Sequence, residues 1–191
     1  MNQEYDVYYV ALKSLKSRFR SVKDLKELLL KKQYPEEYVN QAIDKLLKQG
    51  YLDDCSFAKA YINQQMITTS KGPFKIEREL LDKGVSSDII YRELAVFTKE
   101  EQIVKIEKIA TRLIKSNRSR GGMVLRKKIT YDLQNLGYDV SVINEGLANV
   151  EFSDTKDIQK REYEKLYRRL SKNYSGCLLY TSPSPRDRSV S

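Results

Sequence analysis

The fold is decided by three stretches that share one pattern: LKELLLKKQYPEEYVNQAIDKL at residues 25–46, IERELLDKGVSSDIIYREL at residues 76–94 and ITYDLQNLGYDVSVINEGL at residues 129–147. In each stretch, apolar residues recur three or four positions apart, which is the spacing of one face of a helix. A short turn interrupts each pattern once, so each stretch predicts two helices in succession. Strand-like alternation is scarce elsewhere in the chain, which favours an all-α protein.

The three stretches match position by position. The corresponding apolar residues are Leu29, Leu80 and Leu133 before the turn, Tyr34, Val85 and Tyr138 in the turn, and Val39, Ile90 and Ile143 after it. The register advances by 51 residues and then by 53 residues. A period of this length is typical of proteins built from tandem helical units.

The turn residues agree with this interpretation. The position just before the turn apolar residue holds Gln33, Gly84 or Gly137. Glycine there suits a helix that ends in the left-handed conformation. The residues that follow the turn apolar residue are suited to starting the next helix, and they are Pro35, Ser86 and Asp139.

Each pair of helices has a further amphipathic stretch upstream, at residues 6–16, 54–67 and 99–115. We therefore expect tandem three-helix repeats that form an elongated, curved helical array. The predicted units are residues 1–52, 53–98 and 99–150, followed at residues 151–176 by the start of a truncated fourth repeat.

Residues 177–191 read CLLYTSPSPRDRSVS, where the helical periodicity stops. The stretch resembles translated adaptor or vector sequence, so we expect a non-native tail. A native disordered tail rich in Ser and Pro is the alternative. Either interpretation removes the segment from the predicted fold.

Composition excludes several classes of enzyme. The 191 residues include no histidine and two cysteines, so Ser-His-Asp and Cys-His catalysis and Cys/His zinc sites are ruled out. Paired carboxylates do not stand out, and the eight glycines form no phosphate-binding loop. We expect no enzyme activity, no cofactor and no metal. No stretch approaches the length of a membrane span, and the first ten residues do not resemble a secretory signal, so we expect a cytoplasmic monomer.

The net charge is +9, and part of it is concentrated. Residues 108–131 contain eight basic side chains and no acidic one. Such a stretch predicts a surface that contacts the phosphates of nucleic acid or a nucleoprotein filament, and a solvated basic face is the alternative. The candidate binding residues in this stretch are Arg112, Lys115, Arg118, Arg120, Arg126, Lys127 and Lys128.

Two smaller basic clusters precede or open the second helix of a repeat. Arg18 and Arg20 occupy this place in the first repeat, and Lys71, Lys75 and Arg78 occupy it in the second. An arginine there can grip a phosphate or an acidic protein surface, and it can equally be a surface residue near a helix start. All five are candidate binding residues.

Two further features have plain structural interpretations. Asp53 and Asp54 precede a helix, so they predict capping of its free N–H groups rather than a metal site. Tyr38, Tyr61 and Tyr91 lie at helical spacing, which favours packing over base stacking.

The second repeat carries a recognisable signature. It reads GYLDDCSFAKAYINQQ at residues 50–65 and KGPFKIERELLDKG at residues 71–84. This stretch resembles the central signature of the RecX family, the bacterial regulators of the RecA recombinase. The first repeat's Arg18-Phe19-Arg20-Ser21, followed by Leu25, resembles the family's entry to its second helix. The resemblance covers about residues 8–176.

The resemblance implies an all-helical, non-enzymatic protein that binds RecA filaments on single-stranded DNA. It also implies that the protein restrains filament growth, ATP hydrolysis and strand exchange in recombination and DNA repair. Two alternatives come from the residues alone: a helical DNA-binding protein such as a helix-turn-helix regulator, and a helical-repeat adaptor with a protein partner.

Overall fold

The computed structural model describes residues 3–117, 122–152 and 156–173, and the regular elements within these ranges are helices. Nine of them form three units of three. The first unit holds α1 (Gln3–Ser17), α2 (Val22–Lys31) and α3 (Glu36–Lys48); the second holds α4 (Asp54–Thr68), α5 (Pro73–Asp82) and α6 (Ser87–Leu94); the third holds α7 (Lys99–Ser116), α8 (Gly122–Asn135) and α9 (Val140–Gly146). Helix α10 (Lys156–Asn173) follows. The expected all-α fold of tandem three-helix units is confirmed.

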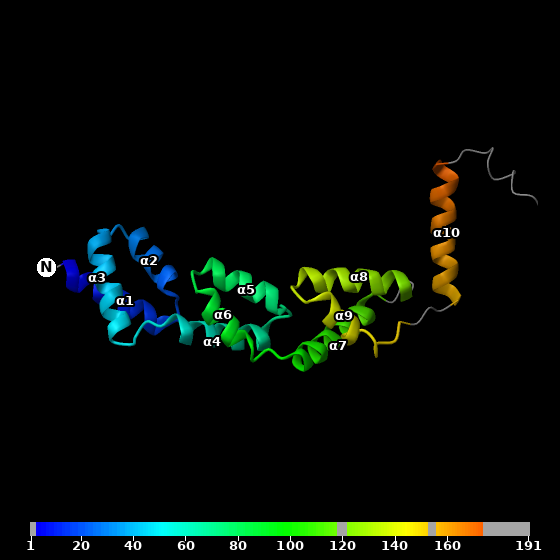
Figure 1. Ribbon diagram of the computed structural model, residues 1–191. Helices are drawn as coiled ribbons and strands as arrows, with labels where there is room; N and C mark the ends of the chain where they lie inside the picture. The colour runs from blue at the N-terminus through cyan, green and yellow to red at the C-terminus, as the bar shows by residue number, and fades with distance from the viewer. Residues whose placement is uncertain (1–2, 118–121, 153–155, 174–191) are drawn as a thin grey trace, which may run out of the picture.

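The three units lie in a row, which makes the molecule elongated (Figure 1). The second helices of the units, α2, α5 and α8, follow one another along the upper edge of the view, while α4 and α7 run along the lower edge (Figure 1). Helix α10 stands apart from the third unit (Figure 1). Each unit therefore meets its neighbour mainly end to end.

The left-handed helix ends predicted for the glycines of the second and third units are confirmed, and the first unit has the same conformation at Gln33. The φ angles are 63° at Gln33, 80° at Gly84 and 90° at Gly137. The predicted starts of the third helices are also confirmed, because Pro35, Ser86 and Asp139 are the N-cap residues of α3, α6 and α9. The same short turn thus recurs in each repeat, and one of the three copies adopts it without glycine.

We expect Gln33→Gly to stabilise the protein. A side chain other than glycine costs about 1 kcal/mol in the left-handed region, and part of that gain is offset by the freedom of glycine in the unfolded chain. The expected increase in the free energy of unfolding is about 0.5 kcal/mol. Urea unfolding of the two proteins measures it, and a loss of stability would show that the Gln33 side chain makes a contact worth more than the strain.

The buried side chains form two clusters. The first is confined to α1, α2, α3 and Leu52. The second runs without interruption through α4–α9, from Phe57 to Leu147, and includes an edge-to-face contact between Phe97 and Tyr138 with ring centres 6.5 Å apart. The second and third units therefore share one apolar core, whereas the first unit keeps its own.

Polar backbone contacts join the second and third units where α5 begins. The Gly72 N–H donates to the Leu136 carbonyl at 2.7 Å, and the Phe74 N–H donates to the Gly137 carbonyl at 3.1 Å. A Cβ atom on Gly72 would lie 2.5 Å from the Gly137 oxygen, which no real side chain tolerates. Glycine at position 72 thus allows the start of α5 to touch the end of α8.

Helix α10 covers most of the predicted start of a fourth repeat, and Tyr163, Leu166, Tyr167 and Leu170 on it are exposed. The division of the chain into separate domains at the predicted boundaries stays a prediction. The predicted tail at residues 177–191 lies outside the described residues. Within the described ranges, no helix combines the length and the apolar character that crossing a membrane requires.

Candidate nucleic-acid interface

In the third unit, the predicted cations of α7 are on the surface. Arg112 and Lys115 are exposed and line a shallow hollow of about 530 Å³ together with Lys108 and Thr111. Arg118 and Arg120 lie outside the described residues. The last turns of α7 therefore present three positive charges on one side, and the acidic Glu107 lines the same hollow.

The predicted cations of α8 differ among themselves. Arg126 and Lys127 are exposed, and the guanidinium of Arg126 lies 5.8 Å from the centre of the Phe152 ring. Lys128 instead forms an ion pair with Asp132, one helical turn further along. Its charge is largely neutralised in place, so Arg126 and Lys127 are the stronger candidates for binding an anion.

Of the three predicted binding cations in the second unit, one is engaged in an ion pair and two are exposed. The Lys71 ammonium lies 2.7 Å from a Glu79 carboxylate oxygen, and the Tyr61 hydroxyl donates to the same carboxylate at 2.8 Å. Lys75 and Arg78 are exposed on α5. Lys71 thus helps to hold α4, α5 and the segment between them in place.

We expect Tyr61→Phe to destabilise the protein in a pH-dependent way. Burial raises the pKa of Glu79, but hydrogen bonds from Lys71 and Tyr61 outweigh it, so the pKa lies below the usual 4.5. A carboxyl with a lowered pKa stabilises the fold above its unfolded pKa, and that stabilisation is lost as the pH falls through the folded pKa. The variant should lose about 1 kcal/mol of unfolding free energy at pH 7 and less at pH 3. Urea unfolding at both pH values measures the difference, and equal losses would contradict the role assigned to the Glu79 charge.

In the first unit, the two candidate arginines flank Phe19 in the connection between α1 and α2. Arg18 is exposed, and Arg20 is half-buried. The Nε atom of Arg20 is buried and has no hydrogen-bond partner among the described residues. The pKa of Arg20 is lowered first by burial and then by the charge of Arg18, and Asp24 opposes this effect. The two positive charges are therefore only partly balanced.

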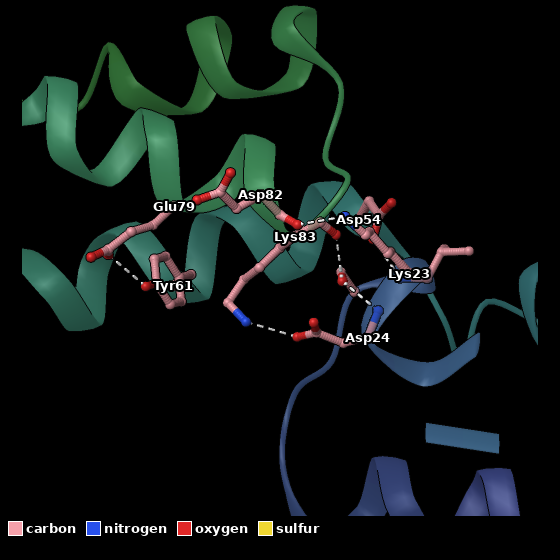
Figure 2. Close-up of polar contacts among 9 residues, drawn as sticks. Lys23, Asp24, Asp54, Tyr61, Glu79, Asp82 and Lys83 are labelled. Atoms are coloured by element: carbon pink, nitrogen blue, oxygen red, sulfur yellow. Dashed lines mark hydrogen bonds and ion pairs between the residues drawn. The ribbon is translucent and has the colours of Figure 1, made fainter. Parts of the chain in front are cut away.

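The junction between the first and second units is polar (Figure 2). The Ser21 hydroxyl donates to the Lys83 carbonyl at 2.7 Å, and the Lys23 ammonium donates to the Asp82 carbonyl at 2.9 Å. The Lys83 ammonium reaches back to Asp24 at 2.8 Å, as Figure 2 shows. The start of α2 thus contacts the end of α5 through side chains, whereas the start of α5 contacts the end of α8 through backbone N–H groups.

The two aspartates at the start of α4, the N-cap residue Asp53 and the first helical residue Asp54, have separate roles. Asp53 accepts hydrogen bonds from the N–H groups of Cys55 and Ser56, so the predicted capping is confirmed for this residue. Asp54 accepts from the Val22 N–H at 2.9 Å, across the junction between the units. Burial raises the pKa of Asp54. Sequence reasoning missed this contact because nothing in the local pattern indicates that Val22 lies nearby.

Some of the candidate cations lie at the two junctions between units. An Arg112 guanidinium nitrogen donates to the Ser70 hydroxyl at 3.2 Å, which places the end of α7 beside the segment that contains Lys71. Arg18 lies at the other junction, where it lines a groove together with residues of α4 and with Lys83 at the end of α5. In the part of the chain that the structure describes, no three His, Cys, Asp or Glu side chains converge in a way that could hold a metal ion.

Comparisons with known proteins identify these units. Residues 8–46 match the family model of the first three-helix domain of RecX, and residues 53–92 match that of the second three-helix domain. The chain belongs to the RecX family. The regulatory protein RecX of Listeria welshimeri is 32% identical over 163 residues, and that of Bacillus velezensis is 32% identical over 149 residues.

These two alignments cover 83% and 78% of this chain, and 61% and 57% of the relatives' own length. The chain therefore spans about three fifths of the curated RecX proteins that it matches. Among solved structures, RecX from Lactobacillus salivarius superposes with a TM-score of 0.71 at 25% identity, over 76% of this chain and 95% of that one. A second RecX crystal structure gives a TM-score of 0.70 at 29% identity, over 74% and 70% of the two chains.

Proposed function

We propose that this RecX-family protein is a non-enzymatic regulator of homologous recombination and DNA repair. It binds RecA filaments on single-stranded DNA as a monomer in the cytoplasm and restrains filament growth, ATP hydrolysis and strand exchange. The match of the first two units to the RecX three-helix domains carries this proposal. The curated relatives are named regulatory proteins, which supports regulation rather than catalysis.

The arrangement of charge supports a nucleoprotein partner. Arg112, Lys115, Arg126 and Lys127 are exposed cations of the third unit, and Lys115 and Lys127 have no ion-pair partner within the described ranges. Exposed cations of this kind displace the counterions of phosphates and make binding depend on salt. Contacts to phosphate position a protein on the DNA without distinguishing one base from another, so we expect little sequence preference.

An ATPase assay tests the proposed regulation. RecA is assembled on single-stranded DNA, and the protein is titrated into the reaction. We expect the rate of ATP hydrolysis to fall with increasing protein and the filament to bind the protein more tightly than bare DNA does. Binding to bare DNA alone would favour the helix-turn-helix alternative. Binding to RecA without DNA, with an unchanged ATPase rate, would favour the adaptor, and either result would contradict the proposal.

A further inference from the structure

The connection between α1 and α2 exposes a phenylalanine between two arginines. Phe19 keeps 71% of its surface accessible to solvent. A phenylalanine stabilises a fold by leaving water, so this side chain contributes little to packing. Its neighbours in the sequence are Arg18 and Arg20, and the half-buried Arg20 carries the Nε atom that lacks an acceptor.

Phe19 stands at a groove of about 460 Å³ between the first and second units. The other lining residues are Arg18 and Asp24, then Phe57, Ala60, Tyr61 and Gln64 on α4, and Lys83 at the end of α5. The groove lies within the size range of small-ligand pockets. The acid that lines it, Asp24, is paired with Lys83, so the charge that remains unbalanced at its edge is positive.

An exposed aromatic ring beside unbalanced positive charges is complementary to an unpaired nucleotide, which has a flat base and a negatively charged phosphate. A base stacks on an exposed ring through its flat face, and the adjacent phosphate accepts hydrogen bonds from guanidinium groups. A phosphate beside the exposed Arg18 would reduce the repulsion between Arg18 and the neighbouring Arg20. An acidic peptide offers the negative charge without a flat ring at every repeat of the backbone.

We propose that this groove is a stacking site for one base of single-stranded nucleic acid, with Phe19 as the stacking ring and Arg18 as the phosphate contact, next to the positive charge of Arg20. The inference rests on the proposed function in one respect, namely that the protein binds single-stranded DNA. It adds a role for an aromatic side chain and a preference for unpaired bases, neither of which charge alone produces.

The test compares two strands of equal length and charge: a thymine oligonucleotide and the same backbone without bases. Wild type should bind the thymine strand more tightly. Phe19→Ala should bind the thymine strand about fivefold to tenfold more weakly, because stacking on one ring contributes at least this much. Its affinity for the strand without bases should be unchanged. The matched control is Tyr91→Ala, which removes a ring that is 85% exposed on α6 and should change neither affinity.

A second variant keeps the ring and adds a direct signal. The protein has no tryptophan, so Phe19→Trp introduces a single reporter. Its affinity for the thymine strand should match wild type, and its emission should be quenched by the thymine strand and not by the strand without bases. Thermal unfolding of each variant checks that the fold is intact.

The possible results separate the two proposals. If wild type binds both strands equally and Phe19→Ala changes neither affinity, the stacking site is wrong and DNA binding stands. If Phe19→Ala weakens binding only to RecA-coated DNA, the groove contacts protein and the stacking site is again wrong. If wild type binds no strand and no RecA filament, both proposals fail.

Discussion

Gly137→Ala is expected to lower the free energy of unfolding by about 3–4 kcal/mol. Two physical costs add at this position. The φ angle of 90° is unfavourable for a residue with a Cβ atom, and a Cβ there would lie 2.5 Å from the Lys75 backbone nitrogen. That nitrogen belongs to the first turn of α5, so it cannot move without disturbing the contact between the second and third units. Urea unfolding followed by circular dichroism measures the loss.

Substitutions at two other glycines measure the conformational cost and the steric cost separately. Gly50 has a φ angle of 71° and no atom within 4 Å of the Cβ position, so Gly50→Ala should cost only about 1 kcal/mol. Gly72 has an ordinary φ of −90° but would place its Cβ 2.5 Å from the Gly137 oxygen, so Gly72→Ala reports the steric cost alone. Equal losses at Gly50 and Gly137 would contradict the close contact between the units.

Replacing the exposed cations of the third unit should have the largest effect on binding. We expect the change of Arg112, Lys115, Arg126 and Lys127 together to Ala to weaken binding to single-stranded DNA on the order of 100-fold near 0.1 M salt. The physical reason is counterion release, which contributes a slope of about −0.7 in log affinity against log salt for each phosphate neutralised. The slope should therefore become less steep by about 2–3 when four contacts are lost. Fluorescence anisotropy with a labelled oligonucleotide across a salt series measures both quantities.

The matched control removes the same charge elsewhere. Lys13, Lys31, Lys32 and Lys48 are exposed residues of the first unit, and none of them takes part in the polar contacts between the units described above. Their joint replacement by Ala changes the net charge equally, so it should leave the salt slope close to wild type. If both variants flatten the slope to the same extent, binding depends on net charge and the third-unit surface has no special role. The ATPase assay should follow the same order of effects.

The positions of the cations suggest why the units are repeated. Arg18 lies at the first junction, and Arg112 lies at the second, where it donates to Ser70. A row of units of the same kind offers charged sites at intervals along its length. A filament with regularly spaced phosphates is the kind of partner that can engage several such sites at once, so weak contacts add to a useful affinity.

The repeat and its turns were determined by the sequence alone. The spacing of Leu29, Leu80 and Leu133 placed the second helices, and the glycines at positions 84 and 137 placed two left-handed ends, whereas the left-handed conformation of Gln33 came from the structure. The conformational preferences of residues and the periodicity of apolar positions act over a few residues, so they can be read directly from a short stretch of sequence. The same reasoning correctly assigned capping to Asp53. It was wrong for Tyr91, which is exposed, because helical spacing does not say which face meets a neighbour.

Only the tertiary structure decided what each charged residue faces. Lys71 and Lys128 look equivalent to Lys75 and Lys127 in the sequence, yet the first pair is engaged by Glu79 and Asp132. The structure alone also showed that the first unit has its own core. The hydrogen bond from Val22 to Asp54 and the groove beside Phe19 join segments that are far apart in the chain. The physical reason is that ion pairs and close contacts depend on distances of a few ångströms between side chains, and those distances are set only when the units pack against one another.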